Sequence, residues 1–473
     1  MSNFVGPSYQ LNTRKADVQR VVNMLPVMNE VPGGKSAAYM KSVPGLEVFS
    51  AYSGGLVVAR GMIANTAGTV MAIVIGDKLY AVGYDGVRAL LGTLATSTGH
   101  VGMKVGLNQL VVVDGPNGYV VALDTGVFTQ ITDPAWLGSN TVDYLGGYFT
   151  FIDPDTQTFY ISALEDALTF DALEFATANS SPDKLVGQSV TSKSLVLFGQ
   201  VATEVWQETG ATDFPFEKNT GVYIEVGLMA AFTAKDLDNS TFWLGKDERG
   251  AGIVYKLEGF RAVRVSTMAI EQTIQRAISE GNDVSTAVAY TYQQGGHSFY
   301  VLQIPGLDTT WTYDVSSKQW HERAELVNGD YEQHRGRFHC YCFDKHLIIG
   351  DDDIIYEYDV DANTNAGDVL VRDRISPHSS VPDLRRVSYG TFELDCTVGY
   401  GIAGQAQASV MMRYSDDGGF EWNGWRTATL GAIGEKTARA RFLRNGSARD
   451  RVWHTRCTDD VPFAIVAASI AAT

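Results

Sequence analysis

A short β-meander that recurs along most of the chain is the feature that most restricts the fold. Between about residues 55 and 358, a Gly or another turn residue repeatedly precedes an alternating strand rich in Val, Ile, Tyr and Phe. Most units hold two apolar strands around a turn of the Gly-Asp, Asp-Gly, Pro-Asn-Gly or Asp-Pro-Asp type, as antiparallel hairpins require. The successive units begin at Gly68, Gly106, Leu145, Lys193, Ser240, His297 and Phe338.

These starts lie roughly 40 to 60 residues apart, and four short strands in a repeat of this size are typical of β-propeller blades. The sequence therefore predicts an all-β protein with an irregular β-propeller of six or seven blades over residues 51–365. An N-terminal arm, residues 1–50, is expected to enter the first blade. Because the repeat carries no Trp-Asp or Kelch signature, a stack of unrelated β-sandwiches is the competing interpretation.

One segment breaks the β pattern and predicts a helix near residues 266–280. Ser266 is placed to cap its start, and Gly281 suits its end. We expect this helix to be inserted between blades, where it covers an edge or, in a ring of subunits, forms a contact between them. Its apolar face consists of Ile270, Ile274, Ala277 and Ile278.

The composition changes at Ala366, where Arg replaces Lys and the acidic excess ends. Four strand-like segments follow, and they predict a separate C-terminal β-sandwich over residues 366–473. The alternation around Phe442 predicts a polar face that would suit contact with a neighbouring subunit. One side of that strand should carry Arg439, Arg441 and Leu443, and the other Ala440, Phe442 and Arg444.

The net charge of −17 is unevenly distributed along the chain. Residues 366–473 hold 13 Lys and Arg against 12 Asp and Glu, which leaves 24 basic and 42 acidic residues before them. The predicted propeller region therefore carries −18 and the predicted sandwich +1. Because phosphate binding depends on clustered Lys and Arg, this argues against a nucleic-acid groove in the propeller region. A surface that DNA slides past without sticking, or ordinary solubility charge, fits the distribution equally well.

The first residues do not combine a basic stretch with an apolar core, so we expect an unprocessed chain. The longest apolar runs, on the scale of Val70 to Ile75, are far shorter than a membrane span, which predicts a soluble protein without stable membrane insertion. Four cysteines in 473 residues cannot form a disulfide framework.

The sharpest local motif runs from Ser415 to Trp422 and fits the Asp-box pattern S-x-D-x-G-x-x-W of sialidase-type propellers. In that pattern the Ser and the Asp bond the turn backbone, so the box fastens a hairpin and is not itself catalytic. A single copy, outside the predicted blades, gives little support to a glycosidase.

Two further clusters invite metal binding. Residues 359–368 alternate oxygen-bearing side chains like a calcium loop, but Thr364 and Leu370 stand where an EF-hand needs Gly and Glu, so a polar turn is the preferred interpretation. In the run from His339 to Cys342, strand alternation places Cys340 and Cys342 on one face and His339 on the other, which favours core thiols over a zinc site. The sequence has no GxSxG, P-loop or HExxH motif. We therefore predict no catalytic, cofactor-binding or metal-binding residues, no cofactor and no enzymatic activity.

The order of these features resembles the tail-hub, or packaged-DNA-stabilisation, proteins of short-tailed phages. The run Val22-Asn23-Met24-Leu25-Pro26 followed by Pro44-Gly45-Leu46 looks like that family's N-terminal arm. The helix with Ile270, Glu271 and Ile274 lies where the family has its I-E-x-x-I segment. The stretch from Gly367 to Arg372-Asp373-Arg374 looks like the family's crossing into the C-terminal β-sandwich.

The resemblance implies a structural virion protein, assembled in the bacterial host cytoplasm, that forms a homo-hexameric ring, or nozzle, in the phage tail. The ring would lie below the portal and its adaptor ring, retain the packaged DNA, form part of the DNA exit channel and seat distal tail proteins such as a needle, spike or fibre. From the charge distribution we expect DNA to pass an acidic lumen without sequence recognition. The alternatives are a glycan-binding or sialidase-like propeller and another β-rich assembly or receptor-binding protein.

Overall fold

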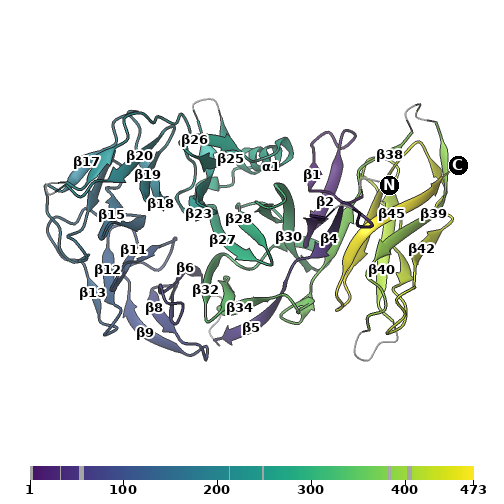
Figure 1. Ribbon diagram of the computed structural model, residues 1–473, viewed down its shortest axis with the longest axis horizontal. Helices are drawn as coiled ribbons and strands as arrows, with labels where there is room; N and C mark the ends of the chain where they lie inside the picture. The colour runs from purple at the N-terminus through teal and green to yellow at the C-terminus, as the bar shows by residue number, and fades with distance from the viewer. Residues whose placement is uncertain are drawn as a thin grey trace.

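The computed structural model describes residues 4–31, 33–52, 58–211, 214–247, 250–381, 383, 385–401 and 407–472. Two β domains lie side by side, with a ring of small sheets at one end of the molecule and a two-layered sandwich at the other (Figure 1). Both termini lie at the sandwich, and the N-terminal segment, drawn in purple, lies between the two domains (Figure 1). This architecture confirms the predicted all-β fold with a propeller followed by a sandwich.

Seven sheets of mainly antiparallel strands follow one another around the propeller axis in the described residues, and we number them blades 1 to 7. Blade 1 comprises β6 (Ala59–Ala64), β7 (Met71–Ile75), β8 (Lys78–Val82) and β9 (Arg88–Thr93), and blade 2 comprises β10 (Gly102–Val105), β11 (Gln109–Val113), β12 (Gly118–Ala122) and β13 (Phe128–Gln130). Blade 3 comprises β14 (Val142–Leu145), β15 (Tyr148–Ile152), β16 (Thr158–Ile161) and β17 (Phe175–Thr177), and blade 4 comprises β18 (Leu185–Thr191), β19 (Ser194–Gly199), β20 (Thr203–Glu208) and β21 (Phe216–Lys218). Blades 5 and 6 comprise β22 (Gly227–Leu228), β23 (Lys235–Leu237), β24 (Ser240–Lys246), β25 (Ala251–Glu258) and β26 (Arg261–Arg264); and β27 (Val288–Gln294), β28 (His297–Gln303), β29 (Thr310–Asp314) and β30 (Gln319–Val327), which pairs with β31 (Asp330–Gln333).

Blade 7 is closed by a strand from the opposite end of the propeller sequence. Its strands β32 (Phe338–Cys342), β33 (Lys345–Ile349) and β34 (Ile354–Asp359) pair in order, and β34 then pairs antiparallel with β5 (Gly45–Ala51). The short strands β35 (Thr364–Asn365) and β36 (Asp368–Val369) extend this sheet beyond β5. The segment predicted to enter the first blade therefore completes the last one, and blade 7 is joined to blade 1 by covalent chain.

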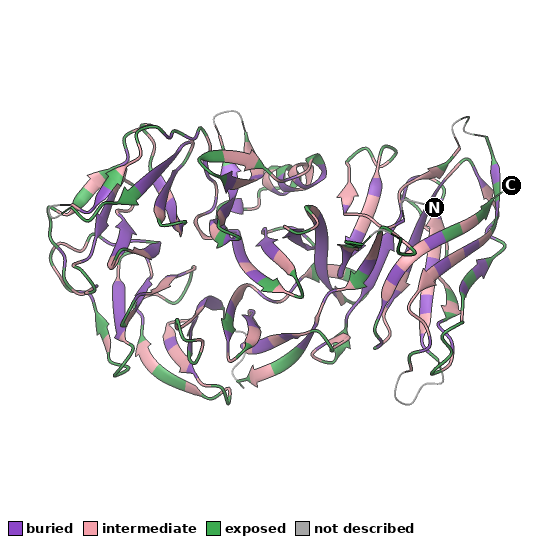
Figure 2. Cartoon of the chain, viewed as in Figure 1, coloured by how far each residue is buried: buried purple, intermediate pink, exposed green. Residues whose placement is uncertain are grey.

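The blades pack face to face through their alternating strands. In β7, Met71 and Ile73 lie in a cluster with Leu347 of blade 7, whereas Val74 lies in a cluster with Leu110 of blade 2. Both faces of an inner strand are therefore buried, which explains why these strands are apolar runs with little polar alternation. Figure 2 shows this burial concentrated in the middle strands of each blade, with exposed residues gathered at the turns and outer strands.

The predicted helix is α1 (Met268–Ser279), which lies between blades 5 and 6. Ile270, Ile274 and Ala277 are buried as predicted, and Gly281 adopts φ +85° just after the helix. The predicted cap at Ser266 is wrong. Thr267 occupies the N-cap position without a side-chain cap bond, because the Ser266 hydroxyl instead donates to Glu271 and accepts from the Val254 amide. Two short 3-10 turns, η1 (Ala231–Thr233) and η2 (Val284–Thr286), flank this region.

The sandwich consists of two sheets, and each includes strands from the N-terminal segment. The first sheet holds β2 (Val18–Val22), β37 (Arg372–Ile375), β44 (Asp450–Cys457), β40 (Ser409–Ser415) and β41 (Arg426–Thr429), with β1 (Tyr9–Gln10) and β38 (Ser379–Ser380) at its margins. The second holds β3 (Met24–Met28), β4 (Ala38–Ser42), β45 (Ala464–Ala472), β39 (Val387–Cys396) and β42 (Ala440–Leu443), with β43 (Ser447–Ala448) on β39. In β42, Ala440 and Phe442 are buried and Arg441 and Leu443 are exposed, as the alternation predicted.

The N-terminal segment lies at the centre of the molecule, which differs from the arm expected from the sequence. β2 pairs antiparallel with β37 of the sandwich and, through Val22 and Glu322, parallel with β30 of blade 6. A single sheet therefore continues from blade 6 through β2 into the sandwich. Such pairing joins strands about 300 residues apart, and local strand patterns carry no information about partners at that distance.

Candidate functional site

The junction between blade 6 and the sandwich buries charged groups around β2. Arg20 on β2 donates from Nε to Glu322 on β30, at 3.1 Å from Oε1 and 3.2 Å from Oε2. Thr309 Oγ1 donates to the same carboxylate at 3.0 Å. Burial alone would lower the pKa of Arg20, but Glu322 raises it above its ordinary value. Arg20 therefore stays charged, and its pair with Glu322 links the two domains.

The run Arg372-Asp373-Arg374 on β37 supplies three further buried links. Arg372 donates from Nη1 to the carbonyl of Val461 at 2.6 Å, which fixes the loop before the last strand of the sandwich. Asp373 accepts from Arg456 Nε at 2.9 Å and from the hydroxyl of Tyr331 on β31. Burial would raise the pKa of Asp373, yet His454 and Arg456 hold it well below its ordinary range. The Asp373 carboxylate therefore stays ionised while it connects β31 of the propeller to β44 of the sandwich.

Arg374 binds the N-terminal segment without a carboxylate partner. Its guanidinium donates to the carbonyls of Phe4 at 2.6 Å and Pro7 at 3.2 Å, and to Gln19 Oε1 at 2.8 Å. Burial lowers the pKa of Arg374 to about 9, and Asp17 only partly opposes this. Arg374 thus uses its fixed fork of donors to hold a segment whose backbone would otherwise leave carbonyls unpaired.

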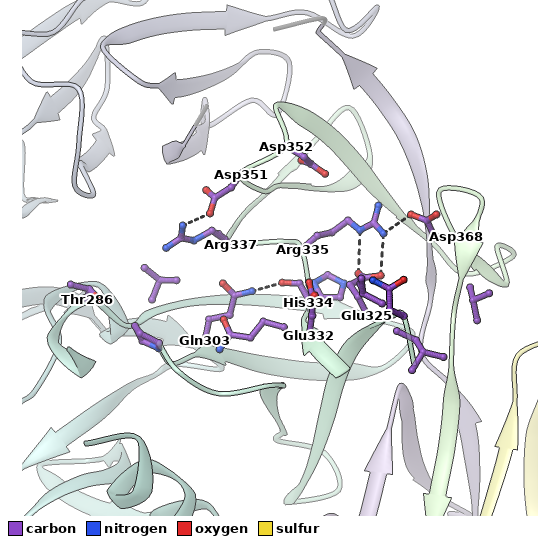
Figure 3. A pocket seen from close by; sticks show the side chains of 17 residues that line it. Thr286, Gln303, Glu325, Glu332, His334, Arg335, Arg337, Asp351, Asp352 and Asp368 are labelled. Carbon is purple, nitrogen blue, oxygen red and sulfur yellow. Dashed lines mark hydrogen bonds and ion pairs between the residues drawn. The ribbon is translucent and has the colours of Figure 1, made fainter. Parts of the chain in front are cut away.

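An open groove of about 860 Å³ lies beside the junction, between blades 6 and 7. Figure 3 shows its labelled side chains coming from η2 and the end of β28, from the β30–β31 hairpin and the segment after it, from the β33–β34 turn and from β36. Five carboxylates line it against two guanidinium groups, which makes the groove acidic. These charged residues are Glu325, Glu332, Asp351, Asp352, Asp368, Arg335 and Arg337.

Both arginines of the groove are engaged by neighbouring carboxylates. Arg335 forms a forked pair with Glu325, at 3.2 and 3.1 Å, and its Nη2 also lies 2.9 Å from Asp368 Oδ2 (Figure 3). Burial would raise the pKa of Glu325, but the charges and hydrogen bonds of His334, Arg335 and Asn365 lower it. Burial lowers the pKa of the adjacent His334 to about 4. The groove thus presents fixed negative charge and no histidine that would ionise near neutral pH.

Neither this groove nor the junction can be predicted directly from the sequence, because their residues come from segments far apart in the chain. The one available signal is the strand around Trp320, in which His321, Glu322, Arg323 and Glu325 interrupt an otherwise apolar pattern. All four are buried in β30. Charged residues inside a buried strand need partners, so this strand marked the place where other segments must supply them.

The Asp box fastens a turn, as its pattern predicted. Ser415 Oγ accepts from the Gly419 amide at 2.8 Å, and Asp417 Oδ1 accepts from the amides of Phe420 and Glu421 at 3.0 and 3.1 Å. These bonds use the polar atoms of the motif within its own loop. Trp422 lies against the guanidinium of Arg413, whose Cζ is 4.9 Å from the ring centroid.

The two clusters considered as metal sites, residues 359–368 and residues 339–342, make other contacts in the structure. In the 359–368 loop, Asn365 donates to Glu325 at 2.9 Å and Asp368 pairs with Arg335, so both side chains are bound to the groove. Cys340 and Cys342 are buried in the layer between blades 1 and 7, and the opposite face carries His339. Burial raises the pKa of Cys342 to about 11.

The described residues contain no group of three or more His, Cys, Asp or Glu side chains arranged to hold a metal ion. Nor do they include a helix that combines the length and the apolar character needed to span a bilayer.

A seven-bladed propeller closed by an N-terminal strand, with that same segment completing a β-sandwich, defines a class of two-domain all-β proteins. Residues 16–364 match the family model described as "Bacteriophage P22 Gp10, beta-propeller", and residues 382–473 match the model "Bacteriophage P22 Gp10, beta-sandwich". The chain belongs to this family of bacteriophage P22 Gp10 proteins. The resemblance deduced from the sequence is thereby confirmed.

Among curated proteins, the chain is similar to the "Tail hub protein gp10" of Salmonella phage P22, with 27% identity over 309 residues. The alignment covers 63% of this chain and 62% of that protein, so the chain spans somewhat less than two thirds of the relative's length. Among solved structures, the N-terminal domain of Nup159 superposes with a TM-score of 0.41 and 9% identity, covering 67% of this chain and 95% of that one. A structure of S. cerevisiae Dbp5 bound to Nup159 and Gle1 gives a TM-score of 0.41 and 10% identity, covering 70% of this chain and 97% of that one.

Proposed function

We propose that this protein is a tail-hub subunit of a short-tailed phage and that it acts without catalysis. Membership in the Gp10 family, over both the propeller and the sandwich, is the observation that carries the proposal. In this proposal six copies form a ring below the portal and its adaptor. The ring retains the packaged DNA, forms part of the exit channel and seats the distal tail proteins.

The junction supports a mechanical role. A hub must hold its shape against pressurised DNA, and a molecule with a loose interdomain linker would yield. Here the sheet of blade 6 continues through β2 into the sandwich, and Arg20, Asp373 and Arg374 fix the three crossing segments. Removing one partner of such a buried pair is strongly destabilising, so the two domains are expected to move as one body.

The acidic character of the propeller supports passage of DNA without adhesion. The excess of 18 negative charges lies before residue 366, and the groove between blades 6 and 7 is itself rich in carboxylates. Like charges repel the phosphate backbone, and few clustered cations are available to release its counterions. We infer an acidic lumen in the assembled ring.

Mass photometry and negative-stain microscopy of the purified protein test this proposal. We expect a six-fold ring, or a monomer that assembles into one on addition of the portal adaptor ring. Virions from an infected host should also carry the protein in the tail. A strictly monomeric protein that ignores the adaptor and hydrolyses a sialoside would favour the glycan-cleaving alternative and overturn the proposal.

A further inference from the structure

The axis of the propeller holds a cavity that is partly open to solvent and has no role in the proposed hub function. It has a volume of about 200 Å³ and is lined by the innermost strands of blades 1 to 5 and 7. Figure 1 shows β6, β18, β23 and β32 around this axis. A water molecule needs roughly 15 Å³ of such space, so the cavity has room for a larger guest. Its charged lining residues are Lys104, Asp143, Lys235 and Asp236.

Three of these four charges have partners within the wall. Lys104 Nζ lies 2.6 Å from Asp143 Oδ1, and the second oxygen of Asp143 accepts from the Val190 amide at 2.9 Å. Asp236 Oδ1 accepts from the hydroxyl of Thr191 at 2.6 Å. Lys235 is the exception, because its ammonium makes no hydrogen bond or ion pair with the residues that the structure describes. Burial, together with the like charge of Lys104, lowers the pKa of Lys235 to about 8, and Asp143 only partly offsets this.

A second unpartnered group faces the same space. Gln188 is 6% exposed, and its Nε2 donates to the carbonyls of Thr150 at 2.7 Å and Thr141 at 3.3 Å. These two bonds fix the orientation of the amide and leave Oε1 without a partner among the described residues. The buried hydroxyl of Thr141, also in the cavity wall, has none within that set either. Buried polar atoms are rarely left unpaired, and each such group calls for an explanation.

We propose that the central cavity binds a small inorganic oxyanion that carries an O–H group, with hydrogen phosphate as the matching chemistry. Its negative oxygens would accept from the Lys235 ammonium and the Thr141 hydroxyl. Its O–H would donate to Gln188 Oε1, which only a donor can satisfy. Sulfate offers the same charge and shape but has no proton at neutral pH, so it would leave Gln188 unpaired. Water could satisfy Gln188 but would leave the partly exposed ammonium of Lys235 without a counter-ion.

Titration of the purified full-length protein with inorganic phosphate at constant ionic strength, followed by calorimetry and phosphorus NMR, tests the proposal. We expect one saturable site per chain and an affinity for phosphate at least several-fold higher than for sulfate. Lys235→Met should weaken phosphate binding tenfold or more, whereas Lys235→Arg should retain most of it. The matched control is Lys184→Met, which removes an exposed lysine paired with Asp155 on the outside of the propeller and should change nothing.

Melting of each variant without phosphate shows whether it is folded. If Lys235→Met does not fold, a crystal of the unmodified protein soaked in arsenate gives the answer, with an anomalous peak expected between Lys235 and Gln188. The proposal is overturned by the lack of a saturable site, by equal affinities for sulfate and phosphate, by unchanged binding in folded Lys235→Met, or by an arsenate peak only outside the channel.

Discussion

Asn23 binds Ala324 with both ends of its side-chain amide. Nδ2 donates to the carbonyl of Ala324 at 2.7 Å, and Oδ1 accepts from the amide of the same residue at 3.1 Å. Nδ2 also donates to the carbonyl of Val371 at 2.8 Å. Asn23 stands at φ +53° between β2 and β3, where the chain crosses from one sheet of the sandwich to the other. Through these three hydrogen bonds, the Asn23 side chain links the turn between β2 and β3 to blade 6 and to the connection between the domains.

Replacing Asn23 with Ala should destabilise the protein by about 2–5 kcal/mol. The change leaves buried backbone groups of Ala324 and Val371 unpaired, at about 1–3 kcal/mol each, and places Ala in a left-handed conformation. The measurement is the free energy of unfolding from urea titration. Asn328→Ala is the matched control, because Asn328 has the same φ of +53° but is exposed. Equal losses in the two variants would show that backbone conformation alone accounts for the effect.

Asp373→Asn should cost about 3–5 kcal/mol, because it leaves the charge of Arg456 buried without a counter-ion. The pKa of Asp373 is lowered in the folded protein, so its contribution is present above the ordinary carboxyl pKa of about 4 and is lost as the pH falls through the folded value. The loss should thus be full at pH 7. Glu393→Gln provides the comparison, since Glu393 pairs with the exposed Arg439 and Arg441 and should cost no more than about 1 kcal/mol. Similar unfolding midpoints for the two variants would contradict the prediction.

The propeller could be predicted from the sequence because hairpins are local. Each blade joins neighbouring strands through short turns, which can be recognised from their residues. The apolar runs of β7 and β11 indicate strands that are buried on both faces. The run from Val22 to Pro26 stands out only by its resemblance to the family's N-terminal arm. Its physical reason is the buried turn at Asn23, whose partners lie about 300 and 350 residues away and leave no trace in the local pattern.

The same limit applies to the junction and to the helix cap. Arg372, Asp373 and Arg374 form a short charged run that, by itself, is typical of a solvated linker, yet all three are fully buried. Only the folded chain shows that carbonyls, Tyr331 and Arg456 surround them. Ser266 was predicted as a cap from its position, but Glu271 and Val254 compete for its hydroxyl. Sequence patterns identify groups that need partners, and tertiary structure decides which partners they receive.

Acid should destabilise blades 6 and 7 as the pH falls below about 6.5, the ordinary pKa of histidine. Burial lowers the pKa of His321 to about 3, of His339 to about 3 and of His334 to about 4. Below a pH of about 6.5, the pKa of histidine in the unfolded chain, the unfolded state binds protons that the folded state does not bind. The free energy of unfolding therefore falls with decreasing pH by about 1.4 kcal/mol per histidine per pH unit. Urea unfolding at pH 7, 6 and 5 measures the slope. His339→Phe should reduce it by one histidine's share, and an unchanged slope would refute the assignment.

The protein should not retard duplex DNA in a gel at 50 mM salt. The propeller region carries −18, and a protein that binds phosphates needs clustered Lys and Arg. A more sensitive measurement is fluorescence anisotropy of a labelled duplex on titration with the assembled protein. Binding that weakens steeply with added salt would reveal a basic lumen and would contradict the proposed weakly adhesive channel.

Closure of the propeller depends on β5, the strand that the N-terminal segment contributes to blade 7. Leu46 on β5 is fully buried, in a cluster with Tyr356 and Tyr358 of β34, whereas Val48 on the same strand is 49% exposed. Leu46→Ala should therefore cost about 2–5 kcal/mol, and Val48→Ala less than about 1 kcal/mol. Because β5 belongs to blade 7 and is followed along the chain by β6 of blade 1, loosening it should separate these two blades and open the propeller between them. Limited proteolysis should then cut the Leu46 variant first in blades 1 and 7. Cleavage that begins in blades 3 and 4, or equal stability of the two variants, would show that face-to-face packing closes the ring without this strand.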